Sequence, residues 1–387
     1  MHFDLIVVGG GPVGASLACA ARGLSTALVA HQAVHAHPVA PGELDARVYA
    51  LGPANVEFLR TLHAWERIPS QRIVPVHAMR VFGDDGRSEI RFDAYRAGVP
   101  ELAWIVEDAV LQHALWREMQ ARGEVRLFAP AECDSLELTA RGARLGLRDG
   151  QKLAAQLVVG ADGANSFVRE HAGIEVSARE YGQAALVANF SCERPHGNTA
   201  YQWFQRGAVL ALLPLPGERV SMVWSLPHGD AGRIGALSPQ ALCQAVEEAS
   251  RGTLGVLSLV TPPRSYPLHR LAARRLVGPR VALVGDAAHV IHPLAGQGLN
   301  LGLQDVRSLA AVLASRETVR APGDLRLLRR YERARAEPIL SMDLMVDGLF
   351  RLFGAGGKTA ESLRNAGLNL TDRLPVLKNI LMRHAMS

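Results

Sequence analysis

A single carboxylate, Asp286, stands at the end of an apolar stretch that is followed by a group of glycines; residues 280–300 read RVALVGDAAHVIHPLAGQGLN. Ligands bind at the carboxyl ends of strands in open α/β sheets, and a carboxylate there can accept hydrogen bonds from sugar-like hydroxyls. Gly296, Gly298 and Gly302 allow backbone N–H groups at a helix N-terminus to approach a planar, electron-rich ring. The stretch therefore predicts that Asp286 holds a sugar-like chain beside a heterocycle.

A second group of glycines lies near the start of the chain, where residues 3–23 read FDLIVVGGGPVGASLACAARG. Gly9, Gly11 and Gly14 have the spacing of a tight turn that brings backbone N–H groups to a pyrophosphate at a helix N-terminus. A purely structural turn is the alternative interpretation of this pattern. Because an apolar strand precedes the glycines and a small-residue helix follows them, the context favours dinucleotide binding.

The strand that follows this helix, at residues 25–30, ends without the acidic residue that the dinucleotide motif predicts about 20 positions after the glycines. Ala30 occupies that position, and His31 and Gln32 come next. Either the adenosine ribose is held more weakly, or a neighbouring side chain supplies the contact. A phosphorylated ribose is a third alternative, but no arginine lies beside Ala30.

Residues 157–169, LVVGADGANSFVR, form a third candidate segment. An apolar strand ends there in Asp162 and Gly163, and Ser166 and Arg169 follow at the start of a helix. The position of Asp162 after a strand resembles that of Asp286, so both carboxylates are expected at the same edge of one sheet.

The elements around these motifs predict an α/β fold in which a Rossmann-like domain is interrupted by a β-rich insertion. Alternating apolar residues at 73–92 and 184–226 are typical of an antiparallel sheet. Between them, residues 106–123 predict an amphipathic helix with Asp108 as its N-cap. The predicted division is a nucleotide-binding domain of residues 1–72, 99–178 and 272–330, a β-rich substrate domain of residues 73–98 and 179–271, and C-terminal helices at residues 331–387.

Histidines and aromatic residues supply weaker candidates. His289 and His292 are spaced as two ligands on one helical face, but no third ligand is near, so we expect structural or ring-packing roles and no metal site. Trp203, Phe204 and Trp224 lie in the predicted sheet, where lining a substrate pocket and packing in the sheet core are about equally supported.

Composition sets the class of protein. The 387 residues, 48% of them hydrophobic and 20% charged, suit about two domains of a globular enzyme. The net charge is +5, and no basic face interleaved with aromatics occurs, which argues against nucleic acid. The four cysteines are widely separated and indicate reduced thiols; they are Cys19, Cys133, Cys192 and Cys243. No signal peptide or membrane-spanning run is seen, so we expect a cytoplasmic protein that could contact a membrane surface.

Together the three segments resemble the group A flavin monooxygenases, the relatives of para-hydroxybenzoate hydroxylase. Within that group the chain is most similar to the FAD-dependent hydroxylases of ubiquinone biosynthesis. The stretches that carry this resemblance are DARVYAL at residues 45–51, WIVEDAVLQHALW at residues 104–116, GDAAHVIHPLAGQGLNLGLQD at residues 285–305 and GLNLTDRLPVLKNILMRHAM at residues 367–386.

The resemblance implies that FAD is the cofactor and assigns roles to individual residues. The glycines of the first turn would take the pyrophosphate, Arg47 and Glu107 would reach the phosphate and ribityl region, and Asp162 would lie near the pyrophosphate and the passing nicotinamide cofactor. Asp286 would bind the ribityl chain. The residues expected to line the isoalloxazine ring are Pro293, Gln297, Gly298, Leu299 and Asn300.

The same resemblance implies the reaction. NAD(P)H would reduce FAD, O₂ would add to flavin C4a, and the hydroperoxide would hydroxylate an aromatic ring, with the cofactor carrying the hard step. No side chain is a certain catalytic residue, and Pro293 and His292 are the candidates near the ring. The expected substrate is a lipophilic polyprenylated phenol or quinol. Hydroxylation of another aromatic, such as a polyketide or a small phenol, and a flavin-binding accessory protein without turnover are the alternatives.

The C-terminal residues 375–387 suggest one further contact. Val376, Leu377, Ile380 and Leu381 fall on one side of a short amphipathic helix, with Lys378 and Arg383 flanking them. Such a helix could touch a membrane surface or a partner in a biosynthetic complex. Packing against its own domain is the default alternative.

Overall fold

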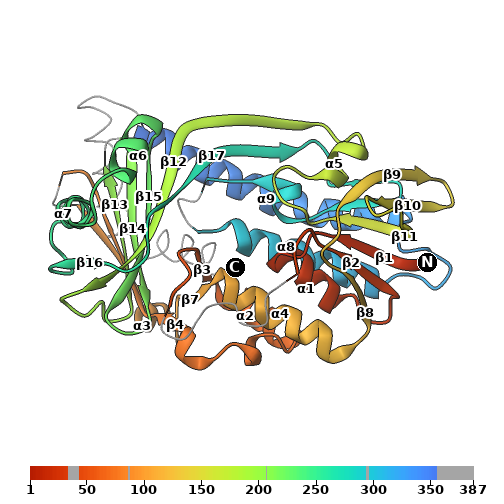
Figure 1. Cartoon of the computed structure of the whole chain (residues 1–387), viewed down its shortest axis with the longest axis horizontal. Helices are drawn as coiled ribbons and strands as arrows, with labels where there is room; N and C mark the ends of the chain where they lie inside the picture. The colour runs from red at the N-terminus through yellow and green to blue at the C-terminus, as the bar shows by residue number, and fades with distance from the viewer. Residues whose placement is uncertain (34–42, 86–87, 206, 293–295, 355–387) are drawn as a thin grey trace.

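The computed structural model describes residues 1–33, 43–85, 88–205, 207–292 and 296–354. Within these residues the chain forms two large sheets and one small sheet. Figure 1 shows the two large sheets at opposite ends of an elongated molecule, with helices between and beneath them. The α/β fold class predicted from the glycine turn and its flanking elements is confirmed.

The first sheet carries the glycine turn and both predicted aspartates. Its central strands pair in parallel and are apolar almost throughout, as expected where helices cover both faces. In order across the sheet, the strands are β18 (Val277–Gly278), β19 (Val281–Leu283), β11 (Lys152–Gly160), β1 (His2–Val8), β2 (Thr26–Val29) and β8 (Val125–Phe128), and the antiparallel pair β9 (Cys133–Thr139) and β10 (Gly142–Leu147) continues from β11. The carboxyl ends of β1, β2, β8, β11 and β19 therefore lie at one edge.

The second large sheet is almost entirely antiparallel. Its strands, in order, are β20 (His289–Val290), β17 (Arg264–Ala273), β12 (Val176–Cys192), β15 (Arg219–Pro227), β14 (Ala208–Leu215), β13 (Thr199–Gln205), β5 (Ala78–Phe82) and β6 (Glu89–Asp93), and β16 (Leu257–Leu259) pairs with β12. The exception is the parallel pair β5 and β13, which joins the two regions of alternating sequence. The long strands β12 and β17 run from this sheet towards the first one (Figure 1).

The small sheet consists of β3 (Val48–Leu51), β7 (Ala103–Glu107) and β4 (Val74–Val76). The helices are α1 (Pro12–Ala20), α2 (Pro53–Thr61), α3 (Ala94–Ala97), α4 (Asp108–Arg122), α5 (Phe167–His171), α6 (His228–Gly235), α7 (Pro239–Ala249), α8 (Gly298–Ala314) and α9 (Leu325–Gly354). Among the described residues, none of these helices is both long and apolar enough to cross a bilayer. The predicted amphipathic segment at residues 375–387 lies outside the described residues.

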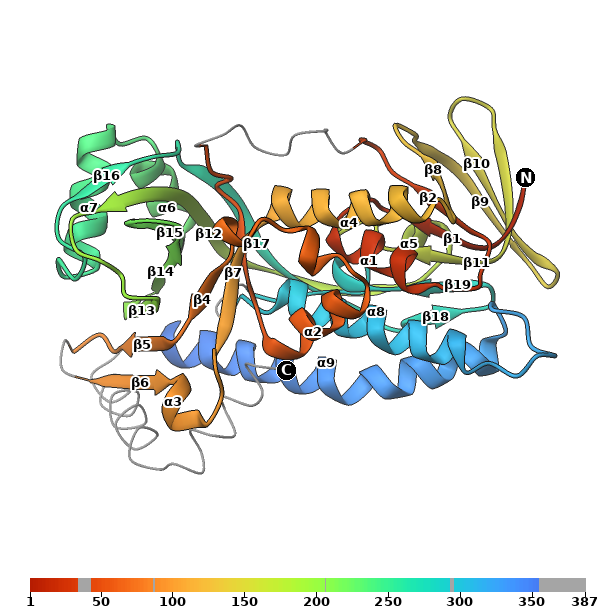
Figure 2. The ribbon, with the colours of Figure 1, turned by 90° about the horizontal axis from the view of Figure 1, so that it is seen from below.

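Helix α9 ties the two large sheets together. It runs along much of the length of the molecule (Figure 2), and its Tyr331 hydroxyl donates to the Leu283 carbonyl in β19 at 2.8 Å. Further along, Asp343 accepts two hydrogen bonds from Arg270 of β17, at 2.7 and 2.5 Å. Because one helix contacts both sheets, it fixes the position of one sheet relative to the other.

The predicted N-cap of α4 is wrong by one residue. Asp108 is the first residue of the helix, and Glu107, the last residue of β7, occupies the N-cap position without a capping hydrogen bond from its side chain. The carboxylate of Asp45 instead accepts a hydrogen bond from the Ala109 N–H at 3.1 Å. Asp108 therefore lies within the first turn of α4, and Asp45 supplies an acceptor to that turn.

Candidate functional site

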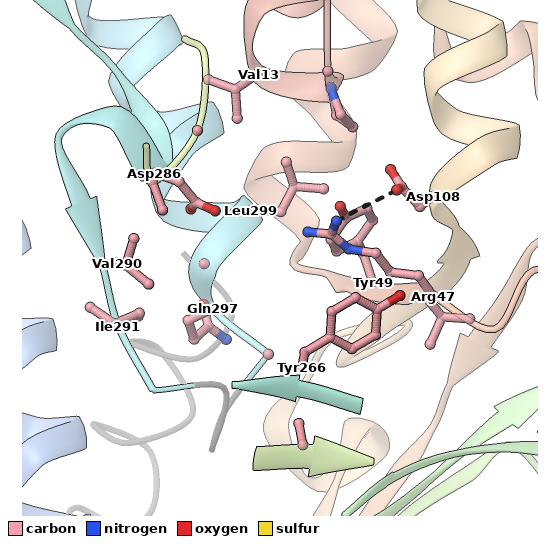
Figure 3. Close-up of a pocket in the computed structure, with 18 of the residues that line it drawn as sticks. Val13, Arg47, Tyr49, Asp108, Tyr266, Asp286, Val290, Ile291, Gln297 and Leu299 are labelled. Atoms are coloured by element: carbon pink, nitrogen blue, oxygen red, sulfur yellow. Dashed lines mark ion pairs between the residues drawn. The ribbon is translucent and has the colours of Figure 1, made fainter. Parts of the chain in front are cut away.

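One large cavity of about 1350 Å³ lies between the sheets. Its walls come from the glycine turn after β1, the ends of β2, β11 and β19, the start of α8, the small sheet, and one face of the nine-stranded sheet. In Figure 3, Asp286, Gln297 and Leu299 lie on one side of the cavity, and Arg47, Tyr49 and Asp108 lie across from them. The predicted motifs, far apart in sequence, thus meet around one space.

The three glycines of the first turn have different roles. Gly9 has a φ of +114°, and a Cβ on it would lie 2.2 Å from the Ala161 carbonyl oxygen. A Cβ on Gly14 would lie 2.0 Å from the Gly9 oxygen, so this glycine permits close packing of α1 on the turn. A Cβ on Gly11 would meet no atom within 4 Å, and Gly11 lines the cavity. Gly11 therefore leaves room for a ligand.

The N-terminus of α1 opens onto the same space. Gly11 is its N-cap and offers no side-chain hydrogen bond, so the first backbone N–H groups of the helix have no cap from that residue. Free N–H groups at a helix N-terminus attract a phosphate through hydrogen bonds and the helix dipole. This end of the cavity can therefore bind a pyrophosphate.

Asp286 follows β19 in a short 3-10 helix (Gly285–Ala287) and reaches the cavity. Burial raises the pKa of this carboxyl, against the lowering effect of His289, Arg47 and His269. No hydrogen bond joins its side chain to another of the described residues. A carboxylate with free acceptor sites inside a cavity can bind a ligand that carries hydroxyl groups.

A buried network fixes the position of this loop. Asp305 of α8 accepts hydrogen bonds from the Gly285 N–H at 3.0 Å, from Arg335 Nε at 2.7 Å and from His289 Nε2 at 2.6 Å. Burial alone would raise the pKa of Asp305, but His289 and Arg335 outweigh it and hold the pKa below its usual range. The structural role expected for His289 follows from this hydrogen bond, since the imidazole faces Asp305 and does not line the cavity.

The start of α8 forms the wall next to Asp286. Gln297 is its N-cap and makes no capping hydrogen bond, and the residues of this turn that line the cavity are Gly296, Gln297, Gly298 and Leu299. A Cβ on Gly298 would meet no atom within 4 Å, so this backbone is open to a planar ring. Pro293, predicted to line the ring, lies outside the described residues.

Asn300, also predicted at the ring, lies behind this wall and does not line the cavity. Its side-chain oxygen accepts from the Gly52 N–H at 3.0 Å and from Asn55 Nδ2 at 2.9 Å, and its Nδ2 donates to the Ala50 carbonyl at 2.8 Å. Asn300 therefore ties the start of α8 to β3 and α2.

Arg47 lies across the cavity from Asp286 and is half exposed to it. Its guanidinium lies 3.9 Å from the Asp108 carboxylate and over the ring of Tyr49, 5.4 Å from the centroid. Burial raises the pKa of Tyr49 and that of Asp108, and Arg47 opposes both shifts. The arginine is thus oriented by two neighbours and keeps its positive charge towards the cavity.

Glu107, predicted to reach the cofactor, does not line the cavity. Its carboxylate is 1% exposed and accepts hydrogen bonds from the Asp45 N–H at 2.6 Å and from Arg72 Nη2 at 2.8 Å. The next residue, Asp108, lines the cavity in its place. Glu107 holds the residue 43–47 segment against the small sheet and so supports Arg47 indirectly.

Asp162 lines the cavity near the glycine turn, as its place after β11 predicts. Its two oxygens accept from the Ser166 hydroxyl at 2.5 Å and from the Val168 N–H at 3.1 Å. Burial raises the pKa of Asp162, and these hydrogen bonds oppose the shift. The carboxylate therefore shapes the turn before α5, and its neighbours Gly163, Ala164 and Asn165 form part of the wall.

The predicted aromatic residues divide between the two faces of the sheet. Phe204 lines the cavity, whereas Trp203 and Trp224 pack in the core on the other face, where Trp203 stacks on Phe82 at 5.4 Å. Successive side chains of a strand point to opposite faces. Of the two alternatives, Trp203 and Trp224 therefore take the core position, and Phe204 takes the cavity position.

His292, a candidate near the ring, also points away from the cavity. Its Nε2 lies 3.0 Å from the Gln183 side-chain oxygen, to which it donates, and its ring packs edge-on to Tyr181 at 4.8 Å. Burial lowers the pKa of His292 to about 4, so the imidazole is neutral at pH 7. His292 fixes the chain after β20 and does not reach the cavity wall.

Several lining residues were missed by the sequence analysis. Tyr49 and Asp108 stand within the stretches that carry the family resemblance, and this could have identified them as lining residues. Tyr266 and His269 of β17, and Glu132 after β8, belong to no motif; only the folding of distant strands brings them to the cavity.

Comparisons with known proteins identify the family. A family model described as the FAD binding domain matches residues 2–341. The 3-demethoxyubiquinol 3-hydroxylase of Escherichia coli is 34% identical over 388 residues, which cover 99% of this chain and 98% of that protein. The ubiquinone hydroxylase UbiL of Rhodospirillum rubrum is 35% identical over 384 residues, covering 99% of this chain and 89% of that protein.

A solved structure shows the same fold. PqsL of P. aeruginosa, in complex with 2-aminobenzoylacetate, aligns with a TM-score of 0.79 at 21% identity, covering 95% of this chain and 99% of that chain. The resemblance stated from the sequence motifs is confirmed by the family match and by the full-length relatives.

Proposed function

The chain belongs to the FAD binding domain family and is an FAD-dependent monooxygenase, and on that premise we propose that it hydroxylates the ring of a phenol or quinol that carries a polyprenyl tail. The relatives named as ubiquinone hydroxylases support this substrate class. The observation that carries the proposal is the apolar half of the cavity.

The residues of the cofactor half fit FAD. We propose that the α1 N-terminus at Gly11 binds the pyrophosphate, that Asp286 accepts the ribityl hydroxyls, and that Gln297, Gly298 and Leu299 face the isoalloxazine ring. Arg47 supplies a positive charge beside the phosphate and ribityl region. When bound, FAD supplies the chemistry by taking electrons from NAD(P)H and passing one oxygen atom of O₂ to the substrate ring.

The other half of the cavity is built by the nine-stranded sheet. The described residues of this sheet that line it include no aspartate, glutamate, lysine or arginine. Its wall residues on β5, β6, β13, β14 and β15 are Met79, Val81, Ile90, Phe92, Ala200, Gln202, Phe204, Val209, Ala211, Leu213, Val223 and Ser225, and we name this set the apolar chamber. A carboxylated or phosphorylated substrate would lack a counter-charge there, whereas an isoprenoid chain matches it.

Strand β17 lies at the border between the two halves. It carries the Tyr266 hydroxyl and the His269 imidazole, and both residues line the cavity; Figure 3 shows Tyr266 near Arg47. These are hydrogen-bonding groups that could hold a phenolic oxygen while the apolar chamber takes the tail. We propose that they orient the substrate ring, and that enclosure by the two sheets excludes water from the reaction.

Tail length tests the proposal. Each buried methylene contributes about 0.8 kcal/mol, so kcat/KM should rise steeply through phenols that carry zero, one and two prenyl units. The measurement is formation of hydroxylated product together with NAD(P)H oxidation. Equal efficiency with the tail-less phenol would refute the tailed substrate and indicate a small-aromatic hydroxylase.

A variant of the apolar chamber sharpens the test. Ala211 lies in the middle of β14 with its side chain towards the chamber, and Ala211→Phe should fill part of that space. We expect kcat/KM to fall much more for the doubly prenylated phenol than for the tail-less phenol, because only the tail needs the space. An equal loss for both phenols would place the tail elsewhere.

A further inference from the structure

The carboxyl end of β2 lacks an acid where the cavity needs one. Ala30 lines the cavity about 20 residues after the glycine turn, at the position where an acidic side chain ordinarily accepts from the adenosine ribose hydroxyls. Ribose hydroxyls lose hydrogen bonds to water when they enter a binding site. Leaving those bonds unreplaced costs free energy, so the site is expected to offer acceptors. A neighbouring side chain at this end of the cavity is therefore the expected substitute for that acid.

Four acidic residues among the described ones line the cavity: Asp108, Glu132, Asp162 and Asp286. Asp108 lies beside Arg47 at the start of α4, Asp162 is occupied by Ser166 and by a backbone N–H, and Asp286 follows β19. Asp108 and Asp286 therefore follow other strands than β2, and Asp162 already has both oxygens bound within its own loop. Glu132 is the remaining candidate.

The backbone places Glu132 beside Ala30. Strands β2 and β8 are parallel neighbours, and after they end, the Ala30 N–H donates to the Phe128 carbonyl at 2.9 Å while the Ala131 N–H donates to the Ala30 carbonyl at 2.8 Å. Glu132 is the next residue, and its Oε1 lies 3.3 Å from Nδ1 of His31. Its carboxylate thus lies next to the chain that continues from Ala30.

Arg148 keeps this carboxylate in place. Its guanidinium forms an ion pair with Oε2 of Glu132, and its N–H donates to the Glu132 carbonyl at 2.9 Å. The side chain of Glu132 remains 38% exposed. A carboxylate has about four acceptor sites, so this contact leaves room for ribose hydroxyls.

We propose that Glu132 accepts the hydrogen bonds of the adenosine ribose of FAD, in place of the acid that is missing at position 30. This inference rests on FAD binding, which the family membership shows, and is independent of the substrate proposed above. His31 and Gln32, which also line the cavity, are the competing candidates.

Titration of apoprotein with FAD, followed by flavin fluorescence, tests the assignment. Glu132→Ala should raise the Kd for FAD by about tenfold, the effect of losing a hydrogen bond to a charged group. Glu132→Gln, which keeps one acceptor oxygen, should fall in between. Asp134→Ala, an exposed carboxylate two residues further on, is the matched control and should bind FAD as the wild type does.

An FAD analogue whose adenosine ribose lacks both hydroxyls separates a direct contact from an effect on folding. The wild type should bind this analogue about tenfold more weakly than FAD, whereas Glu132→Ala should bind the two equally. Adding Ala30→Glu to Glu132→Ala should restore the preference for FAD. If Glu132→Ala still prefers FAD as strongly as the wild type, or if Gln32→Ala alone removes the preference, Glu132 is not the ribose acceptor.

Discussion

Asp286 offers the sharpest test of the cofactor site, because its carboxylate faces the cavity and makes no hydrogen bond to another of the residues that the structure describes. In Asp286→Ala, the ribityl hydroxyls would lose a charged acceptor. A hydrogen bond to a charged group contributes about 1.5–3 kcal/mol, so the loss of one bond should weaken FAD binding by about 10- to 160-fold. The loss of two bonds would multiply these factors.

The same substitution should leave the apoprotein as stable as before. Burial raises the pKa of Asp286, which means that the free protein does not favour the charged form of this carboxyl. Removing the carboxyl therefore removes no stabilising contact from the apoprotein. A lower melting temperature of the Asp286→Ala apoprotein would show that the carboxylate has a structural role instead.

The assay has two parts. The flavin-to-protein absorbance ratio after desalting reports cofactor retention, and titration of the apoprotein reports the Kd. Asp286→Asn, which keeps an acceptor oxygen without the charge, should retain part of the affinity, and Asp134→Ala should retain all of it. A fully yellow Asp286→Ala protein with an unchanged Kd would refute the ribityl assignment.

Four further substitutions test the residues around the cavity. Gly11→Ala should fold normally but bind FAD more weakly, whereas Gly14→Ala should lose stability because its Cβ would lie 2.0 Å from the Gly9 oxygen; thermal melts of both apoproteins distinguish them. Asp305→Asn should lower the free energy of unfolding by about 3–5 kcal/mol in urea titrations, since it leaves buried Arg335 without its charged partner. Burial lowers the pKa of His292 from 6.5 to about 4, so the unfolded state binds a proton on this residue before the folded state does as pH falls below 6.5. The free energy of unfolding should therefore drop by about 1.4 kcal/mol per pH unit between pH 6.5 and pH 4. His292→Gln should flatten that part of the stability–pH curve relative to the wild type, and an unchanged slope would contradict the burial argument.

The sequence predicted that the glycine turn, Asp162 and Asp286 would meet around one cavity, because these residues stand in short motifs. The glycine turn, Asp162 and Asp286 each follow directly after an apolar strand, and parallel strands bring such positions to one edge of a sheet. Local sequence is therefore sufficient to place them. The division into domains stays a prediction, although sheet pairing joins β5 and β6 to the strands of the second alternating region.

The apolar chamber could not be predicted in the same way. Strand alternation predicts that Trp203 and Phe204 point to opposite faces of the sheet, but it does not predict which face borders the cofactor domain. That choice depends on the parallel pairing of β5 with β13, which unites segments more than a hundred residues apart. The position of Glu107 could not be predicted for a similar reason, because Arg72 and the Asp45 backbone bind its carboxylate away from the cavity.

The geometry of a parallel sheet explains how Ala30 can replace the acidic residue of the dinucleotide motif. Strands β2 and β8 end at the same edge, and backbone hydrogen bonds join residue 30 to residues 128 and 131. An acceptor on either strand end can thus face the same part of the cavity, so an acid can be lost from one strand once the neighbouring strand supplies another. By this argument, Ala30→Glu in the wild-type chain should bring little gain in FAD affinity, because it would place a second carboxylate beside Glu132. A clear gain from Ala30→Glu alone would show that the ribose site lacks an acceptor and that Glu132 serves only its ion pair with Arg148.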